Sequence, residues 1–180
     1  MFGVLVGLVV PAQADTSSPV RTVAAVDVTR YMGTWHEVAK YPNFFQRKCV
    51  ADTTATYRLL GAGRVEVTNR CRTADGSFIQ AVGEARQQGA AESPKLKVRF
   101  APEWLSFLPM VWGNYWIIDL DPAYRLAAVS EPTREYLWIL SRTPTVDAGA
   151  YAALVARLQA QGFDTSRLEV ARASLATPKP

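Results

Sequence analysis

Residues 31–40, YMGTWHEVAK, decide how the rest of the chain is interpreted. In an extended strand over this stretch, one side carries Trp35, Glu37 and Ala39, because side chains alternate between the two faces of a strand. A large apolar Trp near the start of a first strand can close one end of a β-barrel. An ordinary core Trp is the alternative reading, and the pattern of the remaining chain distinguishes the two.

Seven further segments have the alternation or the apolar character of β-strands. They cover residues 51–60, 64–72, 77–87, 95–100, 114–120, 124–130 and 135–142. Gly-, Pro- and Asp-containing turns separate many of them, and no helical pattern lies between them. Eight strands in this order predict an all-β fold, an eight-stranded antiparallel up-and-down β-barrel, because closure removes the exposed edges of the sheet.

A single helical pattern follows the predicted strands, over residues 147–161. Tyr151, Leu154, Val155 and Leu158 share one face, and Gly162 is suited to end the helix. We expect this C-terminal α-helix to pack on the outside of the barrel. Residues 166–170 are a candidate ninth strand. The barrel and helix together are expected over residues 27–172, with a loose tail at 173–180.

The N-terminal residues 1–14, MFGVLVGLVVPAQA, have the pattern of an export signal. The apolar run is too short to span a bilayer, and the sequence AQA at residues 12–14 is a signal-peptidase motif. No basic residue precedes the run, so a truncated signal is expected; a buried N-terminal strand is the alternative. Residues 15–26 are expected to be a flexible lead-in. We therefore expect export to the periplasm or the outer membrane, without a lipid-anchor Cys.

The two cysteines are predicted to form a disulfide. Cys49 and Cys71 are nearly equidistant from the turn at residues 61–63, so a hairpin folded there brings them close together. Disulfides are typical of exported proteins. The pairing also leaves no free thiol for catalysis.

The composition argues against several classes of function. Lys and Arg number 20 against 16 acidic residues, giving a net charge of +4, without the basic clusters of a nucleic-acid-binding protein. His36 is the only histidine and is predicted to face outward, so neither a metal site nor a Ser-His-Asp triad can be built around it. We predict no cofactor and no enzymatic activity, with a lipid-modifying enzyme as the minor alternative.

Three motifs resemble those of the lipocalins, specifically the bacterial outer-membrane-type branch related to apolipoprotein D. The segment Gly33-Thr34-Trp35 is similar to the family's G-x-W motif, residues 119–124 (DLDPAY) to its second motif, and residues 136–144 (YLWILSRTP) to its third. The second motif departs from the pattern, because no Thr precedes its Asp and a Pro interrupts it. The resemblance implies that Arg142 packs on Trp35, with Gly33, Trp35 and Arg142 in structural roles.

The resemblance also implies a cavity that takes one small hydrophobic ligand. Extending the parity of Trp35 along the strands, and using the resemblance for the sixth strand, gives the expected lining: Glu37, Ala39, Val67, Asn69, Val98, Tyr115, Ile117, Trp138 and Leu140. This lining suits an acyl chain with a polar head. We predict carriage of a fatty acid or lysophospholipid in cell-envelope storage, transport or maintenance. A barrel filled by its own side chains is the alternative.

Apolar loops are expected at the open end of the barrel, away from Trp35. The loops that follow the first and fifth strands carry Phe44, Phe45, Trp104, Leu105, Phe107, Leu108 and Trp112. So many large apolar residues predict a lid, a peripheral membrane contact or a dimer contact. A protein-interaction module that uses this rim is the competing function. The expected oligomeric state is a monomer or a weak homodimer.

Overall fold

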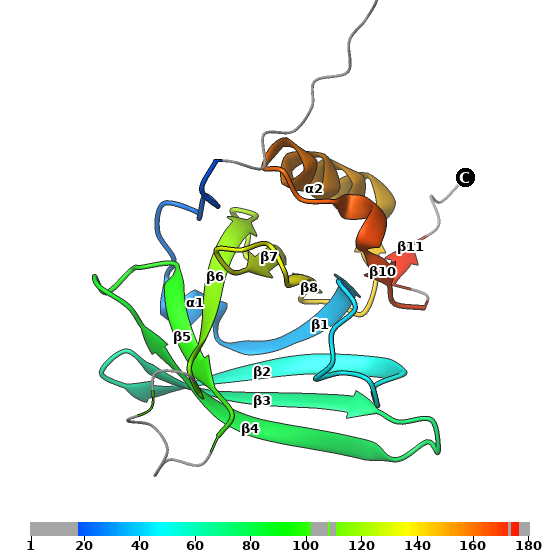
Figure 1. The fold of residues 1–180 in the computed structure, drawn as a ribbon, viewed down its shortest axis with the longest axis horizontal. Helices are drawn as coiled ribbons and strands as arrows, with labels where there is room; N and C mark the ends of the chain where they lie inside the picture. Colours follow the sequence, from blue (N-terminus) through cyan, green and yellow to red (C-terminus); the bar gives the residue numbers. More distant parts are fainter. Residues whose placement is uncertain (1–17, 102–107, 109–110, 173, 177–180) are drawn as a thin grey trace, which may run out of the picture.

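The computed structural model describes residues 18–101, 108, 111–172 and 174–176, and its central feature is a closed β-barrel (Figure 1). Neighbouring strands pair antiparallel in chain order, and the first strand also pairs with the eighth. The barrel strands are β1 (Gly33–Lys40), β2 (Ala51–Gly61), β3 (Arg64–Arg72), β4 (Phe78–Gln87), β5 (Lys95–Arg99), β6 (Gly113–Leu120), β7 (Leu126–Ser130) and β8 (Leu137–Ser141). The predicted eight-stranded antiparallel barrel is confirmed.

The predicted helix is α2 (Ala148–Ala160), which lies on the outside of the barrel (Figure 1). It begins after Asp147, whose carboxylate accepts a hydrogen bond from the Ala150 amide at 2.8 Å, as an N-cap does. Leu154 and Leu158 are fully buried against the barrel wall. Among the described residues, no helix is long and apolar enough to cross a membrane.

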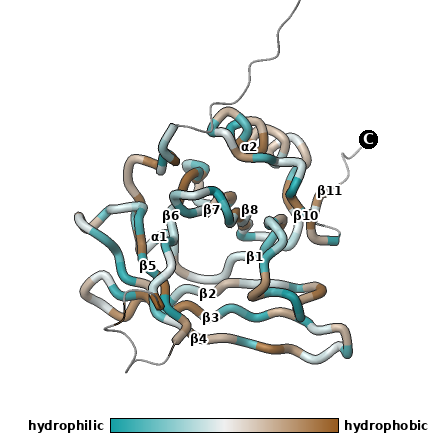
Figure 2. The backbone as a smooth tube through the Cα atoms, in the orientation of Figure 1, coloured by the Kyte–Doolittle hydropathy of each residue, from teal (hydrophilic) through white to brown (hydrophobic). Residues whose placement is uncertain are grey.

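Two apolar clusters hold the fold together. One lies inside the barrel around Trp35, Tyr57, Val67 and Ile117, and the other lies between the barrel and α2. Colour alternates between apolar and polar along several barrel strands in Figure 2, as expected for a sheet whose two faces meet different surroundings. The barrel wall is therefore buried on both faces where α2 covers it.

A β-bulge in β1 corrects one predicted lining residue. Glu37 pairs with Leu140 of β8, but Ala39 pairs with Ile139, so Val38 is an extra residue between them. Leu140 belongs to the cluster inside the barrel, whereas Ala39 and Ile139 belong to the cluster beneath α2. The prediction that Ala39 lines the cavity is therefore wrong, because uniform alternation does not anticipate the bulge.

The expected flexible lead-in is ordered where the structure describes it. Val20 and Val26 are buried, the Val23 amide donates to the Ile117 carbonyl at 3.1 Å, and the Val26 amide donates to the Glu92 carbonyl at 2.8 Å. A short helix, α1 (Val28–Tyr31), then precedes β1. Val20 belongs to the cluster beneath α2, whereas Val26 and Tyr31 belong to the cluster inside the barrel. Residues 1–17, including the proposed export signal, lie outside the described part.

Short elements follow α2. A 3₁₀-helix (Thr165–Arg167) leads into β10 (Glu169–Val170), which extends the sheet beside β1, so the candidate ninth strand is confirmed in shortened form. Within the tail expected to be loose, the structure describes β11 (Leu175–Ala176), which pairs in parallel with β9 (Val146–Asp147).

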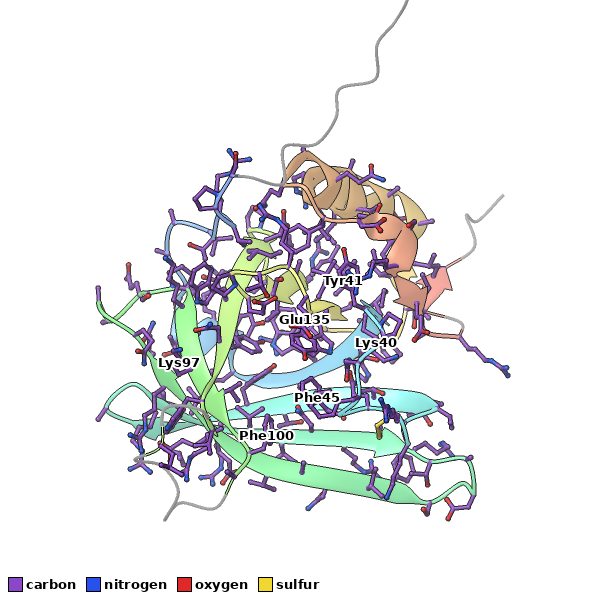
Figure 3. The ribbon with its side chains drawn as sticks, viewed as in Figure 1. Lys40, Tyr41, Phe45, Lys97, Phe100 and Glu135 are labelled. Carbon is purple, nitrogen blue, oxygen red and sulfur yellow. A yellow bond between two sulfur atoms is a disulfide. The ribbon has the colours of Figure 1, made fainter. Side chains whose placement is uncertain are left out.

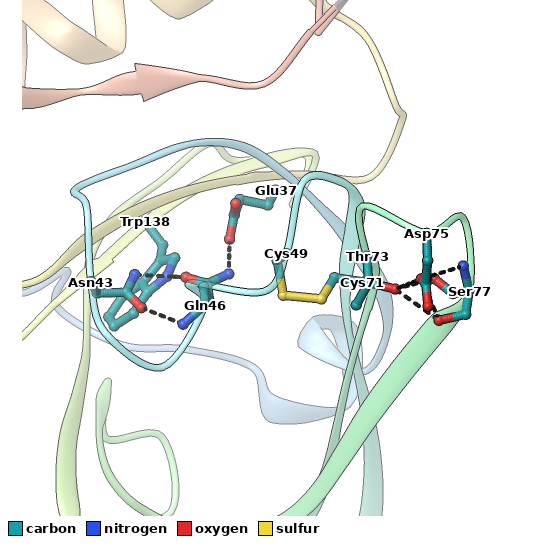
Figure 4. Close-up of a disulfide and its surroundings, with 9 residues drawn as sticks. All are labelled: Glu37, Asn43, Gln46, Cys49, Cys71, Thr73, Asp75, Ser77 and Trp138. Carbon is teal, nitrogen blue, oxygen red and sulfur yellow. Dashed lines mark hydrogen bonds between the residues drawn. A yellow bond between two sulfur atoms is a disulfide. The ribbon is translucent and has the colours of Figure 1, made fainter.

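The predicted disulfide between Cys49 and Cys71 is confirmed (Figure 4). It joins the segment after β1 to the end of β3, with a Cα–Cα distance of 5.5 Å. The bond fixes residues 41–50 against the barrel, near one of its mouths.

Candidate functional site

Arg142 and Trp35 close one end of the barrel, as predicted. The Arg142 guanidinium carbon lies 4.0 Å from the centre of the Trp35 ring. Its nitrogens donate to the carbonyls of Arg30, Thr34 and Tyr124 at 2.7–3.2 Å. Gly33 has a φ of +93°, and a Cβ there would lie 3.2 Å from an Arg142 nitrogen, which explains the glycine of the first motif.

Three tyrosines, two of them buried and Tyr115 half-buried, lie above this closed end. The Tyr115 hydroxyl is hydrogen-bonded to those of Tyr31 and Tyr57, at 3.0 and 2.8 Å. Burial raises the pKa of all three phenols, that of Tyr57 to about 12, so they are neutral. The inward orientation predicted for Tyr115 is confirmed. Tyr57 was missed, although it pairs with Val67, a residue predicted to face inward.

The closed half of the barrel is nearly filled by side chains. A cavity of about 20 Å³ remains there, lined by the three tyrosines and by apolar residues that include Val67 and Ile117. A space of this size holds roughly one water molecule. A long ligand therefore cannot occupy this half without rearrangement of the side chains.

The open half has a different inner wall. Along β3 and β4 the inward pairs run from Val65–Ala85 to Asn69–Ala81 and Cys71–Ile79. Val65 is 1% exposed, but Ile79, at the other end of the same wall, is 41% exposed. The interior of the barrel is thus filled at one end and accessible, with an apolar wall, at the other.

Phe100 covers part of this wall, at the end of β5 (Figure 3). A Cβ on Gly83 would lie 2.7 Å from the Phe100 ring and 2.5 Å from the Arg99 carbonyl oxygen. Gly83 therefore permits a close approach of β5 to β4 that any side chain would block.

A polar group lies on the wall formed by β1 and β8 (Figure 4). The Gln46 side-chain amide donates to Glu37 at 2.6 Å and accepts from the Trp138 indole at 3.0 Å and from Asn43 at 2.7 Å. Burial raises the pKa of the Glu37 carboxyl, and the Gln46 hydrogen bond only partly offsets this effect. Glu37 was predicted as a polar handle; Gln46 was missed, because it lies in an irregular segment.

The other predicted lining residues occupy the inner side of the barrel. Leu140 and Ile117 are buried in the interior cluster, and Val98 and Trp138 pack against it. Asn69 is half-buried and follows Val67 on the inward side of β3. The structure therefore brings all the predicted lining residues except Ala39 to the barrel interior.

The loops predicted to share the open end do so where they are described. The Phe45 ring lies 5.2 Å from the Tyr136 ring. This contact joins the segment after β1 to the segment after β7. Phe44 and Phe45 are 60% and 57% exposed. Of the other predicted rim residues, Leu108 is half-buried. Trp104, Leu105 and Phe107 lie outside the described residues.

Trp112 has a more specific environment than a free rim residue. Its ring lies 4.8 Å from the guanidinium of Arg86 and 5.2 Å from that of Arg99. Two cation–π contacts hold it in a half-buried position. These contacts anchor Trp112 to the strands β4 and β5, and its role in a lid or membrane contact stays a prediction.

The geometry defines a class of protein: an up-and-down β-barrel with a plugged end, an open apolar end and few polar groups inside. Within the described residues, no group of three His, Cys, Asp or Glu side chains is arranged to hold a metal ion. Such a barrel is suited to binding one small hydrophobic molecule.

Comparison with known proteins identifies the family. Residues 26–173 match the model of the lipocalin-like domain. The chain is 40% identical over 149 residues to temperature-induced lipocalin-1 of Arabidopsis thaliana, covering 81% of this chain and 78% of that protein. It is 39% identical over 164 residues to the outer membrane lipoprotein Blc of Escherichia coli K12, covering 89% and 87%. The chain therefore belongs to the lipocalin family, whose members bind small hydrophobic ligands.

Solved structures show the same fold at low sequence identity. Insecticyanin from the tobacco hornworm Manduca sexta has a TM-score of 0.65 at 18% identity, covering 88% of both chains. Apocrustacyanin C2 has a TM-score of 0.62 at 14% identity, covering 81% of this chain and 78% of that one.

Proposed function

We propose that the protein binds and carries one fatty acid or lysophospholipid molecule in the open half of the barrel. The observation that carries this proposal is the apolar inner wall, which is buried at Val65 and accessible at Ile79. An acyl chain gains free energy by leaving water for such a wall, at roughly 25 cal/mol per Å² of buried apolar surface. Glu37, Gln46 and Asn69 offer polar contacts for a head group.

We place this activity in the cell envelope. Residues 1–14 have the pattern of an export signal, and one relative is named an outer membrane lipoprotein. The disulfide agrees with an oxidising compartment. Storage, transport or maintenance of envelope lipid follows from a carrier in that location. A protein that turns over its bound lipid would instead be an enzyme on a lipocalin barrel.

Native mass spectrometry of the protein purified from its own compartment tests this proposal. We expect an added mass that matches a fatty acid or lysophospholipid, with one ligand per barrel. Removal of lipid followed by incubation with oleate or lyso-phosphatidylcholine should restore a one-to-one complex. A protein that carries no lipid and takes up none of those offered would refute the carrier function.

A peripheral membrane contact through the open rim is the second candidate function. The specific observation in its favour is the adjacent, highly exposed pair Phe44 and Phe45, with Arg47 and Lys48 in the same segment. Aromatic rings suit the membrane interface, and basic side chains suit anionic head groups. Contact with a membrane would let lipid enter the barrel without crossing water.

A further inference from the structure

Glu37 holds a carboxylate on the inner wall, and no described residue forms an ion pair with it. It pairs with Leu140, which belongs to the cluster inside the barrel. One carboxylate oxygen accepts the hydrogen bond from Gln46, and the other accepts none from the described residues. Lys40 is the nearby cation on the same strand, but it is ion-paired with Glu169 at 3.0 Å.

A largely buried carboxylate of this kind is costly unless a positive charge or further donors reach it. Gln46 is a neutral donor, and the electrostatic effect of Lys40 on Glu37 is opposed by that of Glu169. Burial accordingly raises the pKa of the Glu37 carboxyl. The charge would be stabilised by a cation that enters the barrel with the ligand.

An aromatic side chain shares a hydrogen-bond partner with this carboxylate. The Gln46 amide that donates to Glu37 also accepts from Trp138, so both side chains flank one amide group. Trp138 stacks with Tyr136 at 5.9 Å and 15°, and Tyr136 contacts Phe45 at 5.2 Å. Trp138, Tyr136 and Phe45 therefore form a row of aromatic rings from the inner wall to the exposed rim. A carboxylate beside aromatic faces is the combination that recognises alkylated ammonium groups.

We propose that this part of the open end, formed by Glu37, Trp138 and Tyr136, binds the positively charged nitrogen of a ligand head group. The inference rests on the proposed function and makes it more specific. It selects lipids with an ammonium group, such as lysophospholipids with a choline or ethanolamine head, over free fatty acids. A fatty-acid carboxylate placed here would be repelled by Glu37.

Three probes with one chain length and different heads test this proposal: tetradecyltrimethylammonium, tetradecylphosphocholine and tetradecyl sulfate, titrated calorimetrically below their micelle concentrations at one ionic strength. We define the selectivity as the Kd of the sulfate divided by the Kd of the ammonium probe. For the unmodified protein we expect a selectivity of about 10. The phosphocholine probe should also bind more tightly than the sulfate.

Glu37→Gln removes the charge and keeps an acceptor for the Gln46 amide. We expect it to lower the selectivity about tenfold, mainly by weakening the ammonium probe. Glu92→Gln removes a charge from an exposed position in the turn between β4 and β5, at the closed end of the barrel, and should leave the selectivity within about twofold, because exposed charges interact weakly. Trp138→Leu keeps an apolar wall and should weaken the ammonium probe more than the sulfate.

The outcomes separate this inference from the proposed function. Equal selectivity in the unmodified protein and Glu37→Gln would overturn the ammonium site, while uptake of the probes would still support a lipid carrier. A Glu37→Gln variant that weakens all three probes equally would also overturn it, because that result indicates a structural role. Failure of the unmodified protein to bind any probe would refute the carrier function itself.

Discussion

The Arg142 guanidinium lies 4.0 Å from the centre of the Trp35 ring and donates to three backbone carbonyls around it. One of these carbonyls belongs to Arg30 before β1, one to Thr34 in β1 and one to Tyr124 before β7. This single side chain therefore ties together the first and last parts of the barrel. The fully buried Trp35 ring closes the barrel interior at the same place.

Arg142→Lys should destabilise the protein by about 2–4 kcal/mol, because a lysine cannot serve three carbonyls and stack on the indole at once. Chemical denaturation monitored by Trp fluorescence measures the change. Arg125→Lys is a matched control, since that side chain is 78% exposed, and it should cost less than about 0.5 kcal/mol. Equal costs for the two variants would contradict the role assigned to Arg142.

Glu84 should stabilise the fold in a pH-dependent way. Hydrogen bonds from Arg64 and Arg86 lower the pKa of its carboxyl from 4.5 to about 2. Because the native pKa is lowered, the stabilisation is present above pH 4.5 and is lost as the pH falls towards 2. Glu84→Gln should therefore cost roughly 1–2 kcal/mol at pH 7, after allowance for the partly exposed arginines, and little at pH 2. A cost that does not change with pH would refute this assignment.

Glu37 should have the opposite pH dependence. Burial raises the pKa of its carboxyl, so the native state holds the proton more tightly than the unfolded state does. The resulting destabilisation is absent below the unfolded pKa of 4.5, grows as the pH rises through the native pKa and is complete above it. Glu37→Gln should thus unfold at higher denaturant concentration than the unmodified protein at pH 7. The difference should disappear at acidic pH, and a variant less stable at pH 7 would contradict the prediction.

The disulfide should stabilise the protein and the position of the loop that carries Gln46. Replacing Cys49 and Cys71 by Ser should cost about 3 kcal/mol, because the bond closes a chain segment with a sequence separation of 22. Thermal unfolding of the double variant, compared with the unmodified protein with and without reductant, measures this cost. An unchanged stability would show that the remaining contacts of residues 41–50 suffice.

If the open rim contacts a membrane, loss of the exposed Phe44 and Phe45 side chains should weaken binding to vesicles. Phe44→Ser combined with Phe45→Ser should reduce co-flotation with anionic phospholipid vesicles several-fold, because two aromatic rings are lost from the interface. The control is Leu59→Ser combined with Leu60→Ser, which removes exposed apolar residues next to the turn at the other end of β2. Unchanged flotation of the Phe variant would exclude this contact.

The regular part of the fold could be predicted from alternation alone. Val65, Val67 and Asn69 are every second residue of β3, which pairs with β4 without a register shift. Val65 and Val67 belong to the cluster inside the barrel, as the alternation predicts. The pairing of Cys49 with Cys71 followed from their distances to one turn. Local pattern and final structure agree in these segments because each strand buries the face that the sequence makes apolar.

Other features depend on contacts that no local pattern contains. The bulge at Val38 is set by pairing between β1 and β8, strands that lie far apart in the sequence. The lead-in is ordered by hydrogen bonds from Val23 and Val26 to distant carbonyls. The amide of Gln46 meets Glu37 and Trp138 only after the barrel has closed. The bulge, the ordered lead-in and the position of Gln46 all depend on tertiary contacts.

A lipid-uptake titration of two variants of β4 tests the central claim most directly. Ile79→Arg places a charge on the accessible inner wall, whereas Val82→Arg places the same charge on the outer side of the strand, where Val82 is already 53% exposed. We expect Ile79→Arg to weaken binding of lyso-phosphatidylcholine at least about tenfold and Val82→Arg to leave it within about twofold. Equal affinities for both variants would show that the ligand does not occupy the barrel.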